Sequence, residues 1–216
     1  MMDGMDQNLV QAILVSKAGS HEEMIEAVAR ASLKAYREGE GERWREWLAG
    51  RFTKSVRRSG RDLAEVQRQI GGVLVKVGFA TALAMTPMRY EEMPKLLREA
   101  QVQGTNRPRG GAWPADEQGL RLTVNGDLDM STGKAAAQVA HGLLAWWLQA
   151  SEGERQHWQD QGEGLWILEV SQPTMAMMHG HVSIHDAGLT EIEAGSLTVK
   201  VQGLPAAVRQ AAGPVI

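Results

Sequence analysis

Lys134 stands in the stretch DLDMSTGKAAAQVAHG (127–142), where a polar turn leads into an alanine-rich segment. The pattern predicts a helix capped by Ser131, with Lys134 in its first turn. Gln138 and His141 follow at spacings that place them on the same helix face. A cation in a first turn is electrostatically unfavourable, so the sequence leaves two interpretations, a solvated lysine or a lysine that meets an anion.

A carboxylate follows a later predicted strand in the stretch HDAGLTEIEAG (185–195). Asp186 ends that strand and Thr190 comes four residues later, although a simple Asx turn would also explain the aspartate. If this strand runs parallel to the one over 119–126, both loops leave the carboxyl edge of one sheet, where open α/β sheets place ligands. There a carboxylate could orient or deprotonate a water, and an ammonium group could stabilise an oxyanion or bind a phosphate.

Two other kinds of chemistry fit poorly. A phosphate-binding P-loop needs four residues between its glycines and a Ser or Thr after the lysine. Here six residues separate Gly126 from Gly133, and Ala135 follows the lysine. Some histidines are close in sequence, but no carboxylate is spaced to complete a familiar metal motif with them, so we expect no metal site at His179, His181 and His185.

The elements that must position these residues occur in two similar series. Both halves read β-α-α-β-α-β-β-α, which predicts an α/β fold of two small three-layer α/β/α halves. Each half is expected to hold a four-stranded mixed, mainly parallel sheet with flanking helices. The strands are predicted over 9–16, 52–59, 72–79, 81–87, 119–126, 164–171, 180–186 and 196–203. The helices are predicted over 21–38, 42–50, 62–70, 91–101, 132–150, 152–161, 172–178 and 205–213.

The two series also align by residue. AVARASL (27–33) matches QVAHGLL (138–144), and Trp47 then falls opposite Trp158. We therefore predict a tandem repeat of about 100 residues per copy. The catalytic pattern is absent from the first copy, because Glu23 stands at the position of Lys134 and Val77 near that of Asp186.

The net charge of −3 conceals an asymmetry. Residues 1–110 carry 18 basic and 14 acidic side chains, a balance of +4, whereas residues 111–216 carry 5 and 12, a balance of −7. The chain has no cysteine, which suits a reducing cytoplasm. Its acidic first ten residues do not resemble a signal peptide, and no run approaches the roughly 18 apolar residues that a transmembrane helix needs.

Two motifs together resemble the type 2 peptidyl-tRNA hydrolase family over about residues 119–210. That family shows D-L-x-M, then G-K-x-A-A-Q-x-x-H-A, and later R-D-A-G-x-T-x-I-x-P-G-[ST]-x-T. This chain reads DLDMSTGKAAAQVAHG and HDAGLTEIEAGSLTV in the same order. It departs from the pattern at Gly142, where the family has alanine, at His185, where it has arginine, and at Ala194, where it has proline.

The resemblance implies hydrolysis of the ester between a peptide and tRNA, without metal or other cofactor, and recycling of the tRNA for translation. The catalytic residues that it implies are Lys134, Gln138, Asp186 and Thr190. We expect substrate contacts nearby at Ser131, Gly133, His141 and Gly188. A non-catalytic RNA- or protein-binding module that keeps the fold is the alternative.

The resemblance divides the chain into three parts. We predict a degenerate, non-catalytic copy over 1–102, a linker over 103–118 and a catalytic domain over 119–216. Since the family typically forms homodimers, the chain could be a monomer that carries its own partner, or a homodimer. The basic first half could contact tRNA through a cluster of cations, although a solvated strand edge would also explain them: Lys54, Arg57, Arg58 and Arg61.

Overall fold

The computed structural model of the chain describes residues 9–39, 41–188 and 191–205. Its first half contains β1 (Val10–Val15), α1 (His21–Glu38), α2 (Glu42–Ala49), β2 (Thr53–Arg58), α3 (Leu63–Ile70), β3 (Val73–Val77), β4 (Ala80–Ala84), the 3₁₀ helix η1 (Tyr90–Glu92) and α4 (Lys95–Glu99). The four strands form one sheet in the order β2-β1-β4-β3. The β1–β2 pair is parallel, and the β1–β4 and β3–β4 pairs are antiparallel.

The second half repeats this arrangement. It contains β5 (Leu120–Asn125), the 3₁₀ helix η2 (Gly126–Leu128), α5 (Thr132–Gln149), α6 (Glu152–Asp160), β6 (Leu165–Val170), α7 (Gln172–Met177), β7 (Val182–His185) and β8 (Leu197–Gly203). The strand order is β6-β5-β8-β7, with β5–β6 parallel and the β5–β8 and β7–β8 pairs antiparallel. The predicted fold class, two mixed four-stranded sheets with flanking helices, is confirmed.

The sheets are less parallel than predicted. Three strands of each sheet run in the same direction, but only one neighbouring pair per sheet is hydrogen-bonded in parallel, because the last strand of each half inserts antiparallel between two of the others. β5 and β7 therefore run in the same direction without being neighbours. Their carboxyl ends still meet at one edge of the sheet, as the site requires.

One predicted helix is wrong in extent. The segment 91–101 splits into η1 and α4, because Pro94 stands at the N-cap and holds Met93 extended, with φ −60° and ψ 128°. The predicted last helix, 205–213, lies outside the described residues except for Pro205. Within the described ranges, no helix is both long and apolar enough to cross a bilayer.

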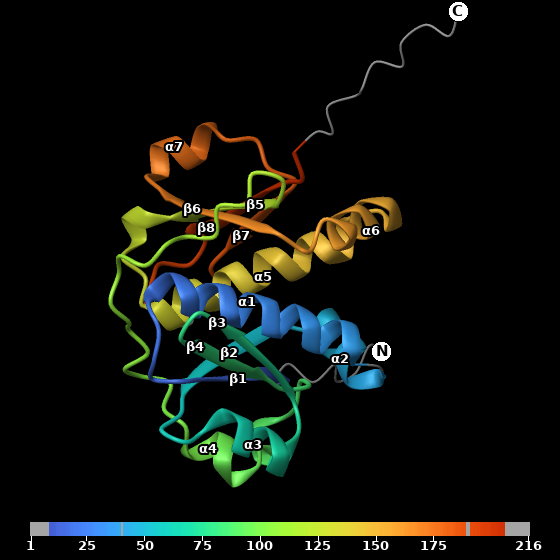
Figure 1. Cartoon of the computed structure of the whole chain (residues 1–216), viewed down its shortest axis with the longest axis vertical. Helices are drawn as coiled ribbons and strands as arrows, with labels where there is room; N and C mark the ends of the chain where they lie inside the picture. The colour runs from blue at the N-terminus through green and yellow to red at the C-terminus, as the bar shows by residue number, and fades with distance from the viewer. Residues whose placement is uncertain (1–8, 40, 189–190, 206–216) are drawn as a thin grey trace, which may run out of the picture.

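The helices form layers around the two sheets. Figure 1 shows α1 and α5 side by side between the sheets, with α3 and α4 below the first sheet and α7 above the second. One hydrophobic core spans the middle of the molecule and includes Ile13 and Val28 from the first half and Leu122 and Val139 from the second. The two halves therefore share their main core.

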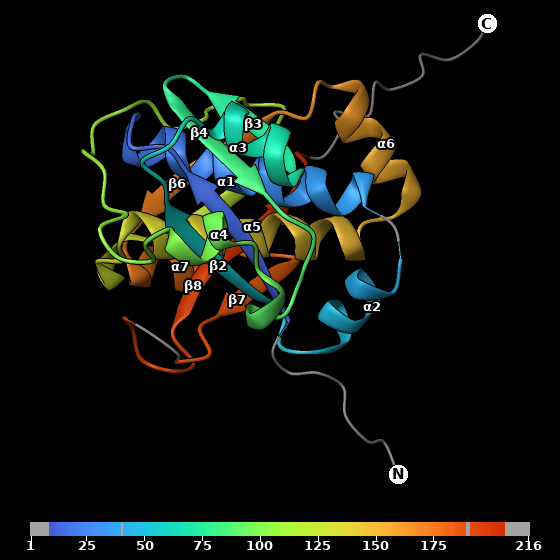
Figure 2. The same cartoon turned by 90° about the horizontal axis from the view of Figure 1, so that it is seen from below.

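α1 and α5 run side by side in the same direction, as Figure 2 also shows from below. At their first turns His21 Nδ1 lies 2.9 Å from Thr132 Oγ1, and near their ends the Arg37 guanidinium lies over the Trp147 ring. α5 packs closely on β8 at Gly142, where an added Cβ would stand 3.0 Å from a Val199 methyl group. The glycine at this position therefore permits the close approach of helix and strand.

Equivalent residues of the two halves make matching interactions. The Trp47 indole donates to Thr53 O at 2.8 Å, and the Trp158 indole donates to Gly164 O at 2.8 Å. Each tryptophan lies in the last turn of the second helix of its half, and its hydrogen bond joins that helix to the start of the following strand.

Equivalent residues also make matching contacts across the interface between the halves. Phe52 and Glu163, which are equivalent in the alignment, both adopt left-handed backbone conformations with φ near 56° and 58°. The Glu163 carbonyl accepts a hydrogen bond from Arg30 of the opposite half, and the Phe52 ring packs 4.8 Å from His141 of the opposite half. Arg30 and His141 are themselves equivalent, so the contact is reciprocal, as in a two-fold interface.

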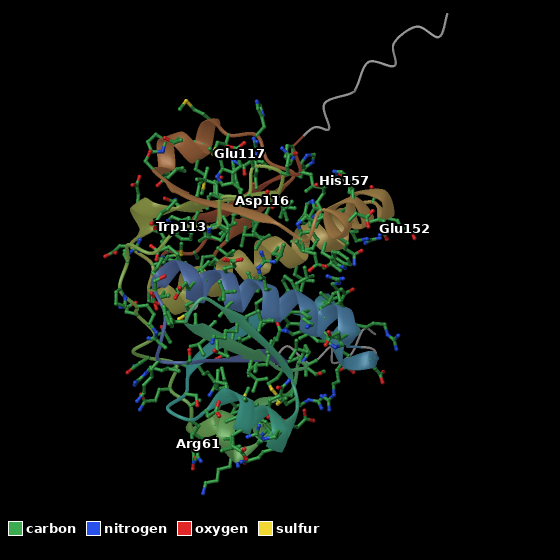
Figure 3. The ribbon with its side chains drawn as sticks, in the orientation of Figure 1. Arg61, Trp113, Asp116, Glu117, Glu152 and His157 are labelled. Atoms are coloured by element: carbon green, nitrogen blue, oxygen red, sulfur yellow. The ribbon has the colours of Figure 1, made fainter. Side chains whose placement is uncertain are left out.

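Residues 103–118 connect the halves and bond to both. Asn106 Oδ1 accepts from the Thr132 amide (3.1 Å), and Pro108 O accepts from the His21 amide (2.9 Å), so the segment binds the first turns of both central helices. Its later part follows β6, where the Asp116 amide donates to Leu165 O. Figure 3 shows Trp113, Asp116 and Glu117 beside the second sheet.

We expect Gly142→Val to lower the free energy of unfolding by about 1–3 kcal/mol, because the new side chain must displace Val199 and Val201 in a packed core. Gly153→Val is the matched control, since no atom lies within 4 Å of an added Cβ there. It should change stability by about 0.5 kcal/mol or less. Urea denaturation of both variants measures the difference, and equal costs would contradict the packing described here.

A candidate active site in the cleft between the halves

A cavity of about 570 Å³ opens between the two halves. One wall is the segment Arg51–Val56, which includes the start of β2. The opposite wall is formed by the first turns of α5 and by the end of β7 with the loop after it. The site therefore lies at the carboxyl edge of the second sheet, and the first sheet closes it from the other side.

Lys134 reaches this cavity from the first turn of α5. The Ser131 hydroxyl caps the helix by accepting from the Lys134 amide at 3.2 Å. The lysine side chain is 11% exposed, and its Nζ pairs with Asp186 Oδ2. This carboxylate offsets the unfavourable placement of a cation at a helix N-terminus, so the lysine meets an anion and is not solvated.

Asp186 is held by backbone on both sides. Its amide donates to Ser196 O (2.9 Å) and its carbonyl accepts from the Gly195 amide (2.8 Å), so the start and end of the β7–β8 loop are joined. Its Oδ1 accepts from the Gly188 amide at 2.8 Å, which is an Asx turn. Gly188 has φ +72°, a conformation that favours glycine. The turn therefore orients the carboxylate that pairs with Lys134.

Gln138 connects the two motifs through its amide group. Nε2 donates to Asp186 Oδ2 at 2.8 Å, and Oε1 lies 2.9 Å from the Thr198 hydroxyl. Thr198 is fully buried and stands where the β7–β8 register shifts between Ile184 and His185. A bulge there turns the threonine toward α5. The Asp186 carboxylate can only accept, so it takes the NH₂ end of the Gln138 amide and leaves Oε1 to the Thr198 hydroxyl, which also lies 3.0 Å from Ile184 O.

The structure brings Lys134, Gln138 and Asp186 together around one carboxylate oxygen. Three of the residues predicted to contact substrate, from the cap and the first three turns of α5, line the cavity as well: Ser131, Gly133 and His141. Gly188 orients Asp186, as described above. Thr190 lies outside the described residues.

The basic residues predicted in the first half do not all lie on one surface. Lys54 lines the cavity, whereas Arg57 points to the other face of the sheet and donates to Leu97 O (3.3 Å). Arg58 bonds to Gln101, and Arg61 pairs with Glu99 at 3.6 Å. Figure 3 shows Arg61 at the end of the molecule formed by α3 and α4.

Cations stand on both walls of the cavity, Lys54 on one and Lys134 on the other, the latter beside the carboxylates of Asp186 and Glu191. Burial, together with the charges of Lys54 and Lys134, holds the pKa of His141 well below 6.5. Burial also lowers the pKa of Lys54 well below its usual 10.5. His141 is therefore neutral at pH 7, chiefly because it is buried, and the two lysine charges add to this effect.

Several residues around the site carry no sequence motif of their own. Thr198 orients Gln138, and Glu191 accepts from the Ser131 hydroxyl at 2.6 Å and so helps to hold the start of α5. Phe52 and Gln11 support Lys54 from the first half. These contacts join segments up to 60 residues apart, and only the fold makes them visible.

The second half of the chain is similar to known proteins. Residues 119–210 fit the family described as peptidyl-tRNA hydrolase PTH2. A protein of Methanopyrus kandleri named peptidyl-tRNA hydrolase is 36% identical over 88 residues, which span 36% of this chain and 76% of that protein. Another of that name, from Thermoplasma volcanium, is 29% identical over 93 residues, which span 37% and 78%.

The lowered pKa of His141 predicts a pH-dependent stability. The unfolded chain binds a proton at His141 below about pH 6.5 and the folded chain does not, so the free energy of unfolding falls as the pH drops from 6.5 to 5. His21, whose pKa burial also lowers, adds to the same trend. Each histidine contributes a slope of up to about 1.4 kcal/mol per pH unit.

Urea denaturation at pH 7.5, 6.5, 5.5 and 5.0 tests this, with His141→Gln as the comparison. The variant should lose less stability than the wild type over this range. Above pH 5 the ordinary carboxylates contribute little to the difference, because their titration lies lower. An unchanged pH dependence in His141→Gln would show that His141 is not the group responsible.

Proposed function

The chain belongs to the PTH2 family of peptidyl-tRNA hydrolases, and we propose that its cleft hydrolyses the ester that joins a peptide to the 3′-terminal ribose of tRNA. The observation that carries the proposal is the meeting of Lys134, Gln138 and Asp186 at one carboxylate oxygen, at the edge of a cavity large enough for a small ligand. By freeing tRNA the reaction would support translation, and we place it in the cytoplasm.

The reaction needs a water that attacks the ester carbonyl. In our proposal Asp186 orients this water and takes one of its protons while the water oxygen bonds to the carbonyl carbon. When the tetrahedral intermediate collapses, the bond from carbon to the ribose oxygen breaks and the proton passes to that oxygen. The products are a free peptide carboxyl group and the free 3′ hydroxyl of tRNA.

Charge develops on the carbonyl oxygen during this attack. The Lys134 ammonium, beside the amides of the first turn of α5, would stabilise it. This fixed cation supplies the positive charge that a metal ion provides in other hydrolases, so we propose that no metal or other cofactor is needed. Gln138, oriented by Thr198, would hold the carboxylate or the water in place, and Thr190 stays a predicted contributor to water placement.

We further infer that residues 1–102 are a degenerate copy of the catalytic domain, 119–216, with 103–118 as the connection. The identical strand orders, the paired tryptophans and the reciprocal contacts at Phe52 and Glu163 support this. In the first copy Glu23 occupies the position of Lys134 and instead completes the capping box of α1 with Ser20. The first copy would thus replace the second protomer of a dimer.

The activity depends on both members of the ion pair. We expect Lys134→Met and Asp186→Asn each to reduce the release of tRNA from peptidyl-tRNA by about 100-fold or more. Each single change also leaves one buried charge unpaired and should cost about 3 kcal/mol of stability. The double variant removes both charges, so it should regain stability without regaining activity.

Gel separation of labelled peptidyl-tRNA from tRNA, in buffer with EDTA, measures the release. Thermal melts of the same samples separate loss of chemistry from loss of folding. Activity that survives both single changes would contradict the assigned roles. A folded wild-type chain that binds tRNA but releases no peptide would favour the non-catalytic binding module.

The internal pairing of the two copies predicts the oligomeric state. α1 covers the face of α5 that a second chain would otherwise cover, so we expect sedimentation equilibrium to give a single species near the chain mass of 23.6 kDa. A concentration-independent mass of twice this value would contradict the internal pseudo-dimer and favour the homodimer.

A further inference from the structure

The cleft has two chemically different walls, and the chemistry proposed above uses only one. The ester-cleaving residues belong to α5 and β7, whereas the facing wall is the segment Arg51–Val56 of the first half. A degenerate copy that served only as packing would need nothing but apolar contacts at this wall. It presents instead a lysine, an aromatic ring and hydroxyl groups to the cavity.

Lys54 is the unusual member of that wall. The residue is 9% exposed, and its Nζ lies 4.3 Å from the Trp47 ring centre and 4.6 Å from that of Phe52. Its hydrogen-bond acceptor is Gln11 Oε1 at 3.1 Å, and among the described residues no carboxylate pairs with it. The ammonium group is therefore held in place by an amide and two rings, without an anion.

The polar residue that binds Lys54 is itself buried and hydrogen-bonded. Gln11 is fully buried, and its Oε1 also accepts from the Ser32 hydroxyl at 2.7 Å. A buried cation without an anionic partner destabilises a fold, and aromatic faces offset only part of that cost. The arrangement makes physical sense if the anion comes from outside and enters through the cleft.

The position of Lys54 relative to the ester-cleaving residues identifies the anion. His141 lies between the two walls, since the Phe52 ring packs against it and the charges of both Lys54 and Lys134 act on it. In the substrate of the proposed reaction, the ester is on the 3′ side of the terminal ribose and a phosphate is on its 5′ side. A nucleotide that spans the cleft with its ester at Lys134 therefore turns its phosphate toward β2.

We propose that Lys54 binds the phosphate of the 3′-terminal nucleotide of tRNA, and that the first half is kept in the chain as the nucleotide-binding wall of the active site. This inference rests on the proposed function and adds a substrate contact to it. Phe52 holds the ammonium group in place and gives the wall an aromatic face. A peptide chain has no phosphate in this position, so the nucleotide is the better match for a buried cation.

Two ester substrates distinguish phosphate binding by Lys54 from a general effect on hydrolysis. The first is an N-acetylaminoacyl ester on a short oligonucleotide that ends in CCA, and the second is the same ester on plain adenosine, which has no phosphate. Lys54→Met should lower kcat/KM for the first about tenfold, mainly through KM, and change it less than twofold for the second. Lys76→Met is the control, because Lys76 is exposed on β3 at the opposite edge of the same sheet, and it should hydrolyse both esters like the wild type.

Stability and binding complete the test. Because methionine removes a buried charge, Lys54→Met should melt at or above the wild-type temperature, which separates lost binding from lost folding. Fluorescence anisotropy is measured with the CCA oligonucleotide that carries no aminoacyl group. It should show about tenfold weaker binding to Lys54→Met and unchanged binding to Lys76→Met. This arm needs no hydrolysis, so it still decides the role of Lys54 if the wild type cleaves neither ester and the proposed function fails.

Equal losses of Lys54→Met on both esters, or unchanged affinity for the oligonucleotide, would overturn the proposal. A loss that appears only when the ester carries an acidic peptide would overturn it as well, and would assign Lys54 to the peptide.

Discussion

The buried ion pair between Lys134 and Asp186 is the constraint on which the site depends. A cation in the first turn of a helix and a carboxylate with 5% exposure are each unfavourable alone. Together the two charges stabilise each other, provided that α5 and the end of β7 hold the ammonium and the carboxylate within hydrogen-bond distance. The bulge at Thr198, the Asx turn at Gly188 and the cap at Ser131 can all be understood as parts that hold this distance.

The two halves meet through a helix pair that serves both. α1 and α5 lie between the sheets and bury one common core, so the first half determines where the start of α5 stands. The connecting segment reinforces this by bonding the first turns of both helices. The arrangement explains how a half without the reactive residues can still form one wall of the cleft and supply positive charge that the acidic second half lacks.

Much of this arrangement could be predicted from residue patterns alone. The alternation of strands and helices and the two motifs around Lys134 and Asp186 gave the fold class and the meeting of the ion pair, because strand ends and helix starts have local signals. Pro94 had such a signal too, but its place at the cap shortened the helix beyond what the pattern indicated.

Other features depend on contacts between distant segments and have no local signal. The bulge that turns Thr198 inward depends on the register between β7 and β8. Lys54 and Arg57 stand three apart on β2 and so point to opposite faces of the sheet. Which of the two faces the cleft depends on which side of β2 meets α5, and the run of basic residues does not show this. Gln11 supports Lys54 from a strand 43 residues away.

The most direct test is a crystal structure of the chain bound to a CCA oligonucleotide whose 3′ end carries an aminoacyl group through an amide, which the site cannot hydrolyse as an ester. We expect the acyl oxygen within hydrogen-bond distance of Lys134 Nζ, a water between Asp186 and the acyl carbon, and the terminal phosphate at Lys54. An acyl group that lies away from the Lys134–Asp186 pair, on another surface of the molecule, would contradict it.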